Sequence, residues 1–459
     1  MPSKNSFPYS RVLVFGAARS GVGAMHLLRH HGIDVVLVDE RPAMEFRSLI
    51  RRLRRLYVTP YFGPIKEDVL RGCKAMIISP GIPLTHKLVR EAQERNIPII
   101  SEVELASYFA CAPIVAITGT NGKTTTTTLA GQMVADAGIN AVVSGNIGRA
   151  FSDGVLSAQD VSRRTVLVTE VSSFQLESIE AFHPHIALIL NITRDHMDRY
   201  RNMREYIDAK FRITLNQNED DFLILNEDDP VTMKAAEDTS AQIRTISLTK
   251  EVEEGAYVRD GRIYLKENGE SIPFCSVADI PMPGAHNVQN TLAALVISRC
   301  LGIPTDSLLK TLAKFKGVEH RTERVETSRD GVLYINDSKA TNVDSLEKAL
   351  LSFDKPVVLI AGGKDKQSAY ERLNSLVKER VKALVLIGEA RPLIKKAWGD
   401  LVPTKEAATL EEAVKIASAL AKSGDVVLLS PACSSFDMFR NFEERGCQFK
   451  RAVRDHLGL

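Results

Sequence analysis

The sequence predicts an α/β protein built from three domains, and three observations support this prediction. The chain has 459 residues, which is too long for one hydrophobic core and suggests about three domains. Short apolar runs alternate with helical stretches along most of the chain, as in parallel sheets covered by helices. A small β meander interrupts this alternation near the middle, and the alternation resumes after it.

The first domain, expected over residues 1–101, opens with a βαβ pattern. A strand, a glycine turn, a helix and a second strand are expected over residues 11–15, 16–21, 22–30 and 33–38. The pattern is typical of a Rossmann-like nucleotide-binding turn, with Asp39 where an acid would meet a ribose hydroxyl. It is equally typical of a plain βαβ turn, because Ala18 replaces the middle glycine of the fingerprint. Two more strands are expected over residues 75–78 and 97–100.

One segment of this domain is strongly basic. Its arginines alternate with leucine and isoleucine at helical spacing, and they are Arg47, Arg51, Arg52, Arg54 and Arg55. We interpret the segment as the solvated face of an amphipathic helix rather than a membrane or nucleic-acid patch.

The second domain, expected over residues 102–317, carries the most informative motif. An apolar, β-branched stretch, at the start of an α/β unit that begins at Ile114, leads into a glycine-bracketed loop and then an expected helix. The loop residues, expected to hold a triphosphate, are Gly119, Thr120, Asn121, Gly122, Lys123, Thr124 and Thr125. Backbone N–H groups and the helix N-terminus bind phosphate oxygens, Lys123 adds a charge, and Thr124 offers a hydroxyl to Mg²⁺. The loop is a shortened P-loop, because Ile117 stands where its first glycine is expected.

Polar residues follow two other strands of this domain. Glu170 ends the strand over residues 166–169, as a Walker-B acid does, although a strand-terminal Glu is as often only exposed. His196, in an Asp-His-Met-Asp run, follows the strand over residues 186–190. Near a phosphate site, a metal role is favoured for it over a structural one.

Lys210 is unusual because it falls on an apolar helical stripe, which we expect to consist of Met203, Ile207, Phe211 and Thr214. A buried ammonium costs several kcal/mol. Either the lysine extends to water, or it is chemically altered or associated with a metal.

The β meander is expected over residues 256–275, with turns at Asp260-Gly261 and Asn268-Gly269, before a helix that starts near Asn287. The third domain, expected over residues 318–459 after a linker near Gly317, is again Rossmann-like. Its strands are expected over residues 332–335, 357–360, 383–387 and 426–429. Polar clusters follow three of these strands, which predicts a binding face at one edge of the sheet.

Composition excludes several other classes of protein. The net charge of +2 predicts no polyanion partner, and the six cysteines form no C-x-x-C pair, as expected for reduced thiols in the cytoplasm. The first ten residues do not form a signal peptide, and no apolar run is long enough to span a membrane.

Taken together, these motifs resemble those of the Mur ligases, the ATP-dependent amide-forming enzymes of peptidoglycan synthesis. The resemblance rests on G-T-N-G-K-T, T-E-V-S-S-F-Q-L, N-I-T-R-D-H-M-D, G-A-H-N, E-H-R, N-D-S-K-A-T-N and S-P-A-C-S-S-F-D, which occur in family order. The first domain is similar to that of the D-glutamate-adding members. The resemblance therefore implies a ligase that adds D-glutamate to UDP-N-acetylmuramoyl-L-alanine through an acyl phosphate.

The resemblance also implies roles for individual residues. Lys123, His196 and Lys210 would be catalytic, and two Mg²⁺ ions would be held by Thr124, Glu170, His196 and Lys210, with Lys210 as an N-carbamate. Besides the phosphate loop, ATP would be bound by Asn287, Arg321 and Asp337. The uridine nucleotide would be bound by Arg19, Ser20, Asp39, Ser79 and Gly81, with Asn146 on the muramoyl-peptide side. D-Glutamate would be received by Lys339, Thr341, Lys364, Ser435 and Phe442.

Two alternatives remain open at this point. Another Mur-type or folylpolyglutamate-type ligase would share the phosphate loop, and a nicotinamide-dependent dehydrogenase would use the loop at Gly16 but leave the phosphate loop unexplained. The enzyme is expected to act as a monomer, without nucleic acid and without membrane insertion.

Overall fold

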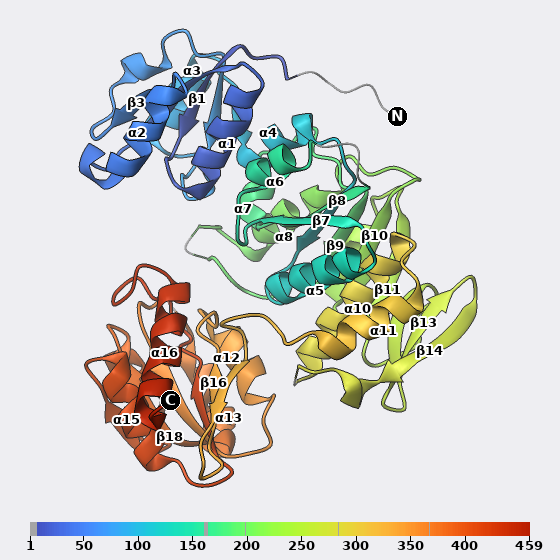
Figure 1. Cartoon of the computed structure of the whole chain (residues 1–459), viewed down its shortest axis with the longest axis vertical. Coiled ribbons are helices and arrows are strands. Elements are labelled where there is room, and N and C mark those ends of the chain that lie inside the picture. Colours follow the sequence, from blue (N-terminus) through green and yellow to red (C-terminus); the bar gives the residue numbers. More distant parts are fainter. Residues whose placement is uncertain (1–6, 160–163, 198, 283, 367) are drawn as a thin grey trace. The chain divides into compact units, whose positions relative to one another are not determined.

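The structure is a computed structural model, and it describes residues 7–159, 164–197, 199–282, 284–366 and 368–459. These residues form three β-sheets with helices packed beside them (Figure 1). The chain divides into two compact units. The first unit comprises Met1–Arg194, Asn202–Ser276 and Asn290–Leu312. The second comprises Asp195–Arg201, Val277–Gln289 and Ala313–Leu459. The three-domain α/β architecture is as expected, whereas the domain limits at residues 101 and 317 remain predictions.

The first sheet is parallel throughout, in the order β3-β2-β1-β4-β5. Its strands are β1 (Arg11–Phe15), β2 (Asp34–Asp39), β3 (Thr59–Phe62), β4 (Ala75–Ile78) and β5 (Ile99–Ser101). The helices of this part are α1 (Arg19–His30), α2 (Arg47–Arg55), α3 (Lys87–Glu94) and α4 (Glu102–Phe109). Helix α1 begins at Arg19 rather than at residue 22, so Arg19 and Ser20 lie in its first turn instead of in a loop.

The second sheet has the order β14-β13-β12-β11-β10-β9-β6-β8-β7. Its strands are β6 (Ile114–Thr118), β7 (Asn140–Gly145), β8 (Thr165–Glu170), β9 (Ile186–Ile189), β10 (Phe222–Asn226), β11 (Gln242–Ser247), β12 (Gly255–Arg259), β13 (Arg262–Glu267) and β14 (Glu270–Ser276). The helices are α5 (Lys123–Asp136), α6 (Phe151–Ser157), α7 (Ser173–Leu176), α8 (Met203–Phe211), α9 (Pro230–Met233), α10 (Ala285–Cys300) and α11 (Thr305–Lys314).

The meander forms as expected, with its turns at the two predicted Asx-Gly pairs, but it does not stand apart from the sheet. Strand β12 pairs in parallel with β11, and β13 and β14 then add antiparallel strands. The expected insertion is therefore an extension of the central sheet.

The third sheet has the order β15-β16-β20-β17-β18-β19, with only β15 antiparallel. Its strands are β15 (Glu323–Thr327), β16 (Leu333–Asn336), β17 (Val357–Gly362), β18 (Val381–Ile387), β19 (Thr404–Glu406) and β20 (Val426–Leu429). The helices are α12 (Val343–Leu350), α13 (Asn374–Arg380), α14 (Arg391–Trp398), α15 (Leu410–Leu420) and α16 (Phe442–Leu457).

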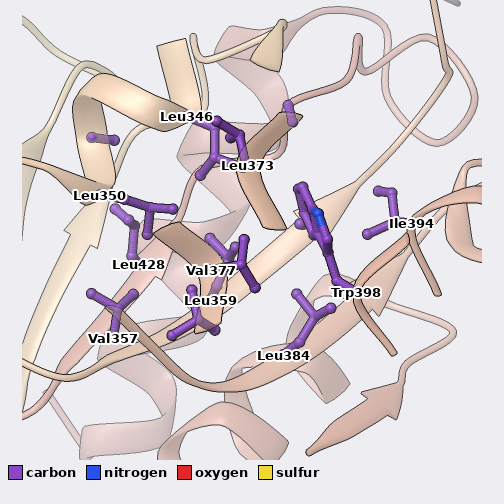
Figure 2. Close-up of a cluster of buried hydrophobic side chains, with 14 of the residues drawn as sticks. Leu346, Leu350, Val357, Leu359, Leu373, Val377, Leu384, Ile394, Trp398 and Leu428 are labelled. Carbon is purple, nitrogen blue, oxygen red and sulfur yellow. The ribbon is translucent and has the colours of Figure 1, made fainter. Parts of the chain in front are cut away.

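Figure 2 shows the core on one face of this third sheet. Leu359 and Leu384 point from the strands toward Val377 and Trp398, and all four side chains are fully buried. Trp398, the only tryptophan of the chain, donates its indole N–H to the carbonyl oxygen of Tyr370 at 3.1 Å. The bulky side chain thus fills the core without leaving its polar atom unpaired.

Two expectations drawn from composition can also be compared with the structure. None of the six cysteines forms a disulfide among the residues that the structure describes. In the part of the chain that the structure describes, none of the helices has the length and apolar character needed to span a membrane.

Candidate active site

The phosphate loop connects β6 to α5 and is shaped by glycine. Gly122 precedes the helix with φ +85°, and a Cβ atom there would come within 2.2 Å of Asn290 Oδ1. A side chain at this position would be excluded both by the backbone conformation and by the close contact. Lys123 Nζ donates to the carbonyl oxygens of Gly119 and Thr120, each at 2.8 Å. The lysine therefore lies across the loop, where a phosphate would otherwise meet only backbone groups.

Glu170 lies at the carboxyl end of β8, next to the loop, and only 1% of it is exposed. It accepts a hydrogen bond from Thr124 Oγ1 at 2.8 Å and another from Asn146 Nδ2 at 3.0 Å. The structure thus brings three of the predicted site residues together. A buried carboxylate beside a hydroxyl is the set of oxygen ligands that a hard divalent cation prefers.

Asn191, which follows β9, is hydrogen-bonded to the backbone of the phosphate loop. Asn191 Oδ1 accepts from the backbone N–H of Asn121 at 2.9 Å, and Asn191 Nδ2 donates to the carbonyl oxygen of Asn121 at 3.0 Å. This pair of bonds fixes the loop to the end of β9.

Lys210 is buried, as the apolar stripe indicated, but the stripe itself was wrongly assigned. The buried residues of α8 are Tyr206, Ala209 and Lys210, whereas Met203 and Ile207 are only partly covered. Lys210 is 1% exposed and its Nζ donates to the carbonyl oxygen of Gly119 at 2.9 Å. It also lies 4.7 Å from the centre of the Tyr206 ring. The side chain therefore points toward the phosphate loop, which excludes the alternative that it extends to water.

Tyr206 is a site residue that the sequence did not reveal. Its hydroxyl lies 3.0 Å from Thr120 Oγ1, which in turn donates to the carbonyl oxygen of Thr193 at 3.1 Å. No motif marks a single tyrosine on a helix so distant in sequence from the loop.

His196 belongs to the second compact unit, whereas Lys210 and Glu170 belong to the first. Its φ of +57° is unusual for a residue other than glycine. Its Nε2 lies 3.7 Å from Asp195 Oδ2, which also accepts from Asn342 Nδ2 at 3.1 Å. The predicted metal role of His196 remains a prediction, and Asp198 of the same motif lies outside the described residues.

The turn after β1 is tightly closed around Gly16, which has φ +102°. A Cβ atom there would lie 2.5 Å from Ser79 Oγ, so the Gly16 and Ser79 turns touch at the carboxyl ends of β1 and β4. Arg19 and Gly81 are exposed near these turns. The predicted uridine-binding residues therefore gather at one edge of the first sheet.

Asp39 is held by its neighbours in this region. It accepts from the backbone N–H of Ala17 at 2.7 Å and from Arg41 Nη2 at 2.8 Å. Burial alone would raise the pKa of the Asp39 carboxyl, but the Arg41 and Ala17 hydrogen bonds outweigh it and lower the pKa. The acid is ionised and oriented by Arg41, a partner that the sequence analysis missed although it lies two residues away.

The predicted ATP residues Asn287, Arg321 and Asp337 all lie in the second unit. Asp337 is buried and accepts from the backbone N–H of Thr322 at 3.1 Å and from Ser430 Oγ at 2.9 Å. Burial raises the pKa of Asp337 to about 6, and the nearby positive charge of Arg321 opposes this rise. The structure thus brings Arg321 and Asp337 together, while Asn287 lies buried in the first turn of α10.

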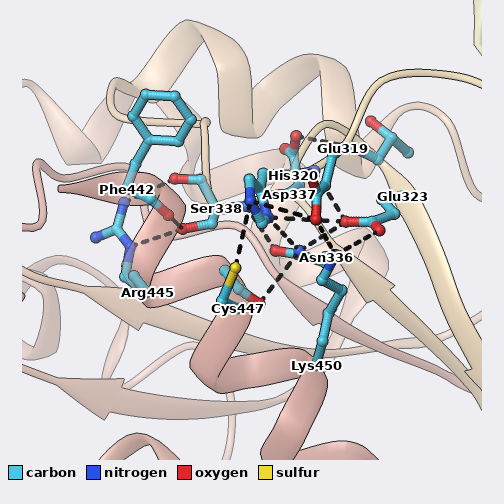
Figure 3. A network of polar contacts seen from close by, with 12 residues as sticks. Glu319, His320, Glu323, Asn336, Asp337, Ser338, Phe442, Arg445, Cys447 and Lys450 are labelled. Atoms are coloured by element: carbon cyan, nitrogen blue, oxygen red, sulfur yellow. Dashed lines mark hydrogen bonds and ion pairs between the residues drawn. The ribbon is translucent and has the colours of Figure 1, made fainter. Parts of the chain in front are cut away.

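Figure 3 shows a polar network around His320, beside Asp337. Asn336 Nδ2 donates to His320 Nδ1 at 2.9 Å, so the imidazole carries its proton on Nε2. Burial lowers the pKa of His320 and keeps the ring neutral. The ligand atoms of Glu319, His320 and Cys447 lie within 4.8 Å of one another. A metal at this cluster would need a lone pair on His320 Nε2. Because Nδ1 accepts the hydrogen bond from Asn336, Nε2 carries the proton and has no lone pair to offer.

The predicted D-glutamate residues come from the loops that follow β16, β17 and β20 and from the start of α16. Lys364 and Ser434 form an isolated antiparallel bridge, which places Ser435 beside the exposed Lys364. Lys339 Nζ lies 5.2 Å from the centre of the Phe442 ring. Thr341 donates its backbone N–H to the carbonyl oxygen of Lys339 at 2.9 Å.

Arg445 supports these loops and was missed by the sequence analysis. The side chain is fully buried, and its Nη2 donates to the carbonyl oxygens of Ser338 and Cys433 at 2.8 and 3.2 Å. Burial lowers the pKa of Arg445 to about 10. Because Arg445 carries a positive charge directly behind the predicted carboxylate-binding residues, it also adds to the potential there.

Comparisons with known proteins cover nearly the whole chain. Residues 10–101 match the Mur ligase MurD-like N-terminal domain, residues 117–298 the Mur ligase middle domain, and residues 320–433 the Mur ligase glutamate ligase domain. A curated relative from Geobacter sp. (strain M21) is 46% identical over 97% of both chains, and one from Thermoanaerobacter sp. (strain X514) is 42% identical over 97% of this chain and 98% of its own. Both are named UDP-N-acetylmuramoylalanine--D-glutamate ligase.

Solved structures share the fold at low sequence identity. A pseudomurein peptide ligase type C from Methanothermus fervidus has a TM-score of 0.61 at 17% identity, covering 97% of this chain and 100% of its own. The UDP-N-acetylmuramate-alanine ligase MurC from Thermotoga maritima has a TM-score of 0.60 at 17% identity, covering 98% and 100%.

Proposed function

The chain belongs to the Mur ligase family, and from this premise we propose that it joins D-glutamate to UDP-N-acetylmuramoyl-L-alanine at the expense of ATP, in peptidoglycan precursor synthesis. The observation that carries the proposal is the buried contact between Thr124 and Glu170 beside a glycine-bracketed phosphate loop, in a chain whose full-length relatives bear that ligase's name. The match of residues 10–101 to the MurD-like domain favours D-glutamate as the amino acid and argues against the folylpolyglutamate-type and dehydrogenase alternatives.

The carboxylate must be activated before an amine can attack it, because a carboxylate is a poor electrophile. The γ-phosphoryl group passes from ATP to the alanyl carboxylate, which releases ADP and leaves an acyl phosphate. The free amine of D-glutamate attacks the acyl carbon and loses a proton, and inorganic phosphate leaves as the amide forms. ATP and the two substrates account for every atom.

Lys123 contributes to the first step. Charge is spread over the oxygens of the transferring group, and a fixed cation close to them stabilises the transition state. The two backbone carbonyls that Lys123 now contacts hold its ammonium over the loop. The side chain is thus oriented before ATP binds, which lowers the cost of reorganisation.

We propose that Thr124 and Glu170 hold one Mg²⁺ ion and that His196 and Lys210 serve a second. The first pair fits a hard cation, since a hydroxyl oxygen and a carboxylate oxygen lie 2.8 Å apart and Glu170 is buried. When bound, Mg²⁺ neutralises negative charge on the phosphate oxygens.

The role of Lys210 as an N-carbamate rests on its burial beside the loop. The ammonium first loses one proton, and the resulting amine adds CO₂ and loses a second proton, so that a buried cation becomes an anion with two oxygen ligands. The carbamate nitrogen keeps one N–H, so the bond to the carbonyl oxygen of Gly119 can persist. Modification therefore replaces a buried ammonium beside the phosphate loop with a group that suits a cation site.

We propose substrate roles for the remaining residues. Asn146 faces the muramoyl-peptide side and already donates to Glu170. Lys364, with Thr341, Ser435, Lys339 and Phe442 around it, offers the cationic and hydroxyl groups that two carboxylates of D-glutamate require. The uridine nucleotide lies at the edge formed by Asp39, Arg19, Ser20, Ser79 and Gly81.

We also propose that the enzyme works as a monomer in the cytoplasm. The scattered cysteines include no C-x-x-C pair, which fits a reducing compartment.

The proposed function is tested by phosphate release from ATP in the presence of UDP-N-acetylmuramoyl-L-alanine and a panel of amino acids. D-Glutamate should support turnover far better than L-glutamate, L-alanine, lysine or diaminopimelate. If one of the others supports turnover better, the family is right but the amino acid is wrong. If none supports turnover, the ligase function itself is wrong.

A further inference from the structure

Helix α2 (Arg47–Arg55) carries a concentration of charge that the proposed ligase reaction does not use. Five of its nine residues are arginine and none is acidic. All five arginines are exposed, whereas Leu49 and Leu53 are buried against the first sheet. The helix is therefore amphipathic as predicted, and its outward face consists almost entirely of guanidinium groups.

Helical geometry gathers these charges on one side. At about 100° per residue, Arg47, Arg51, Arg54 and Arg55 fall within an arc of roughly 100°, and Arg52 widens it to about 160°. The buried leucines lie on the opposite arc. The face is thus a continuous basic surface about three turns long.

The surrounding chain does not compensate this charge. Among the residues that the structure describes, none of the five arginines forms an ion pair. Arg47 and Arg51, and likewise Arg51 and Arg55, stand at the i,i+4 spacing where like charges destabilise a helix. The helix dipole favours the arginines of the last turn but not Arg47 or Arg51. Because the whole chain has a net charge of only +2, this surface is a local feature rather than a general one.

Exposed apolar side chains stand at both ends of the basic face. Met44, in the turn just before α2, is 67% exposed. Tyr57, two residues after the helix, is 85% exposed and is held out with φ +53°, and Tyr61 in β3 is 44% exposed. Tyrosine is the residue that prefers the boundary between headgroups and acyl chains of a lipid bilayer.

The exposed side chains beside the arginines lead us to replace the sequence-based interpretation of a merely solvated face, and we propose that the basic face of α2, with Met44, Tyr57 and Tyr61, docks reversibly onto an anionic phospholipid surface. Five cations match lipid phosphates, and the flanking side chains can enter the headgroup region, which a nucleic-acid backbone would not offer. The apolar face of α2 is already buried against the sheet, so the helix cannot insert. Binding is consequently electrostatic, shallow and sensitive to salt.

The basic face extends from the predicted nucleotide edge of the first sheet to the opposite edge. Helix α2 runs from the carboxyl end of β2, where Asp39 lies, back to the amino end of β3. Arg54, Arg55 and Tyr57 therefore lie away from Asp39. Met44 precedes the helix, and Tyr61 lies one residue before the strand position that pairs with Asp39, so both lie at the nucleotide end.

Sedimentation of the full chain with vesicles tests the proposal. Vesicles of phosphatidylcholine mixed with phosphatidylglycerol should bind the chain, vesicles of phosphatidylcholine alone should not, and added salt should release it. Each arginine contributes about fivefold to partitioning, so the triple variant Arg51→Gln, Arg54→Gln, Arg55→Gln should bind about 100-fold more weakly. The corresponding triple lysine variant keeps the charge and should bind nearly as well as the wild type.

A matched control removes the same net charge elsewhere. Arg329, Arg451 and Arg454 are exposed, and their triple glutamine variant should bind vesicles like the wild type. All variants should retain ligase turnover, which shows that they are folded. Equal loss in both glutamine variants, binding to neutral vesicles, or displacement from vesicles by single-stranded RNA at equal phosphate concentration would each overturn the proposal.

Discussion

Lys123 is the residue on which we expect phosphate binding to depend most. Its ammonium is only partly buried and contacts backbone carbonyls rather than the core. Lys123→Ala should therefore leave the fold intact but remove about 3 kcal/mol of transition-state stabilisation, or roughly 100-fold in turnover. Steady-state phosphate release measures the loss, and circular dichroism checks the fold. A variant that retained more than about half of the wild-type turnover would contradict this role.

Lys210 allows a test of the carbamate. Lys210→Ala should be almost inactive, because the oxygen ligand is lost, and added formate or acetate should partly restore turnover by filling the vacated space. Lys210→Arg should not respond, since its charge remains positive and its side chain occupies the space. Turnover measured with and without formate distinguishes these outcomes. Full activity of the alanine variant without formate would show that no carbamate is needed.

Individual site residues were predictable where they belonged to a motif. The phosphate loop follows β6 and Glu170 ends β8, and the structure brings Thr124 of the loop into contact with Glu170, as the motifs indicated. Tyr206 and Arg445 were not predictable, because each is a single residue on a helix and acts through contacts distant in sequence. Arg41 could have been predicted, because the side chain of a basic residue two positions after Asp39 can fold back and donate to the carboxylate.

At the scale of elements, buried strands were easier to predict than edge strands. The central strands β1, β4 and β20 are continuous apolar runs, and their predicted limits agree with the structure to within a residue. Strands β3 and β19 are short, mostly exposed edge strands, and only pairing with a neighbour makes them strands. Local sequence does not contain that information.

The contact between α4 and α6 predicts a pH dependence of stability. Glu102 on α4 accepts the backbone N–H of Ser152 on α6 at 2.5 Å, and its other oxygen, Oε2, is buried without a hydrogen-bond partner among the described residues. Burial raises the pKa of Glu102 from 4.5 to about 7. The folded chain thus holds a proton that the unfolded chain has already lost, so stability falls as the pH rises from about 4.5 to about 7.

The variant Glu102→Gln isolates this effect, because the amide keeps its carbonyl oxygen and does not ionise. Above about pH 7 the variant should be more stable than the wild type, by on the order of 3 kcal/mol. Below about pH 4.5 the two should be equally stable. Urea unfolding across this pH range gives the difference. Parallel pH profiles for the two proteins would contradict the assignment of the proton to Glu102.

At the scale of the whole molecule, the chain has two compact units with separate cores. The only tryptophan, Trp398, lies in the core of the second unit. Its fluorescence should therefore report unfolding of that unit alone, while far-ultraviolet circular dichroism reports both. We expect the two urea transitions not to coincide, as is common for chains of several domains. Coincident transitions would show that the units unfold as one.

The succession of three α/β sheets was predictable from the alternation of strands and helices, but the extent of the central sheet was not. The meander was expected as an insertion, and the local pattern does not show that its first strand turns back across residues 248–254 to pair in parallel with β11. Function was predictable because its motifs span all three sheets in one order, and the comparisons confirm the family.

The central claim is that the chain makes an amide through an acyl phosphate. UDP-N-acetylmuramoyl-L-alanine labelled with a heavy oxygen isotope in its alanyl carboxylate tests this claim most directly. The reaction with ATP and D-glutamate should transfer one labelled oxygen to each inorganic phosphate released, because the acyl phosphate keeps that oxygen when the carbon–oxygen bond breaks. Mass spectrometry of the phosphate measures the transfer. Amide product accompanied by unlabelled phosphate would contradict the account.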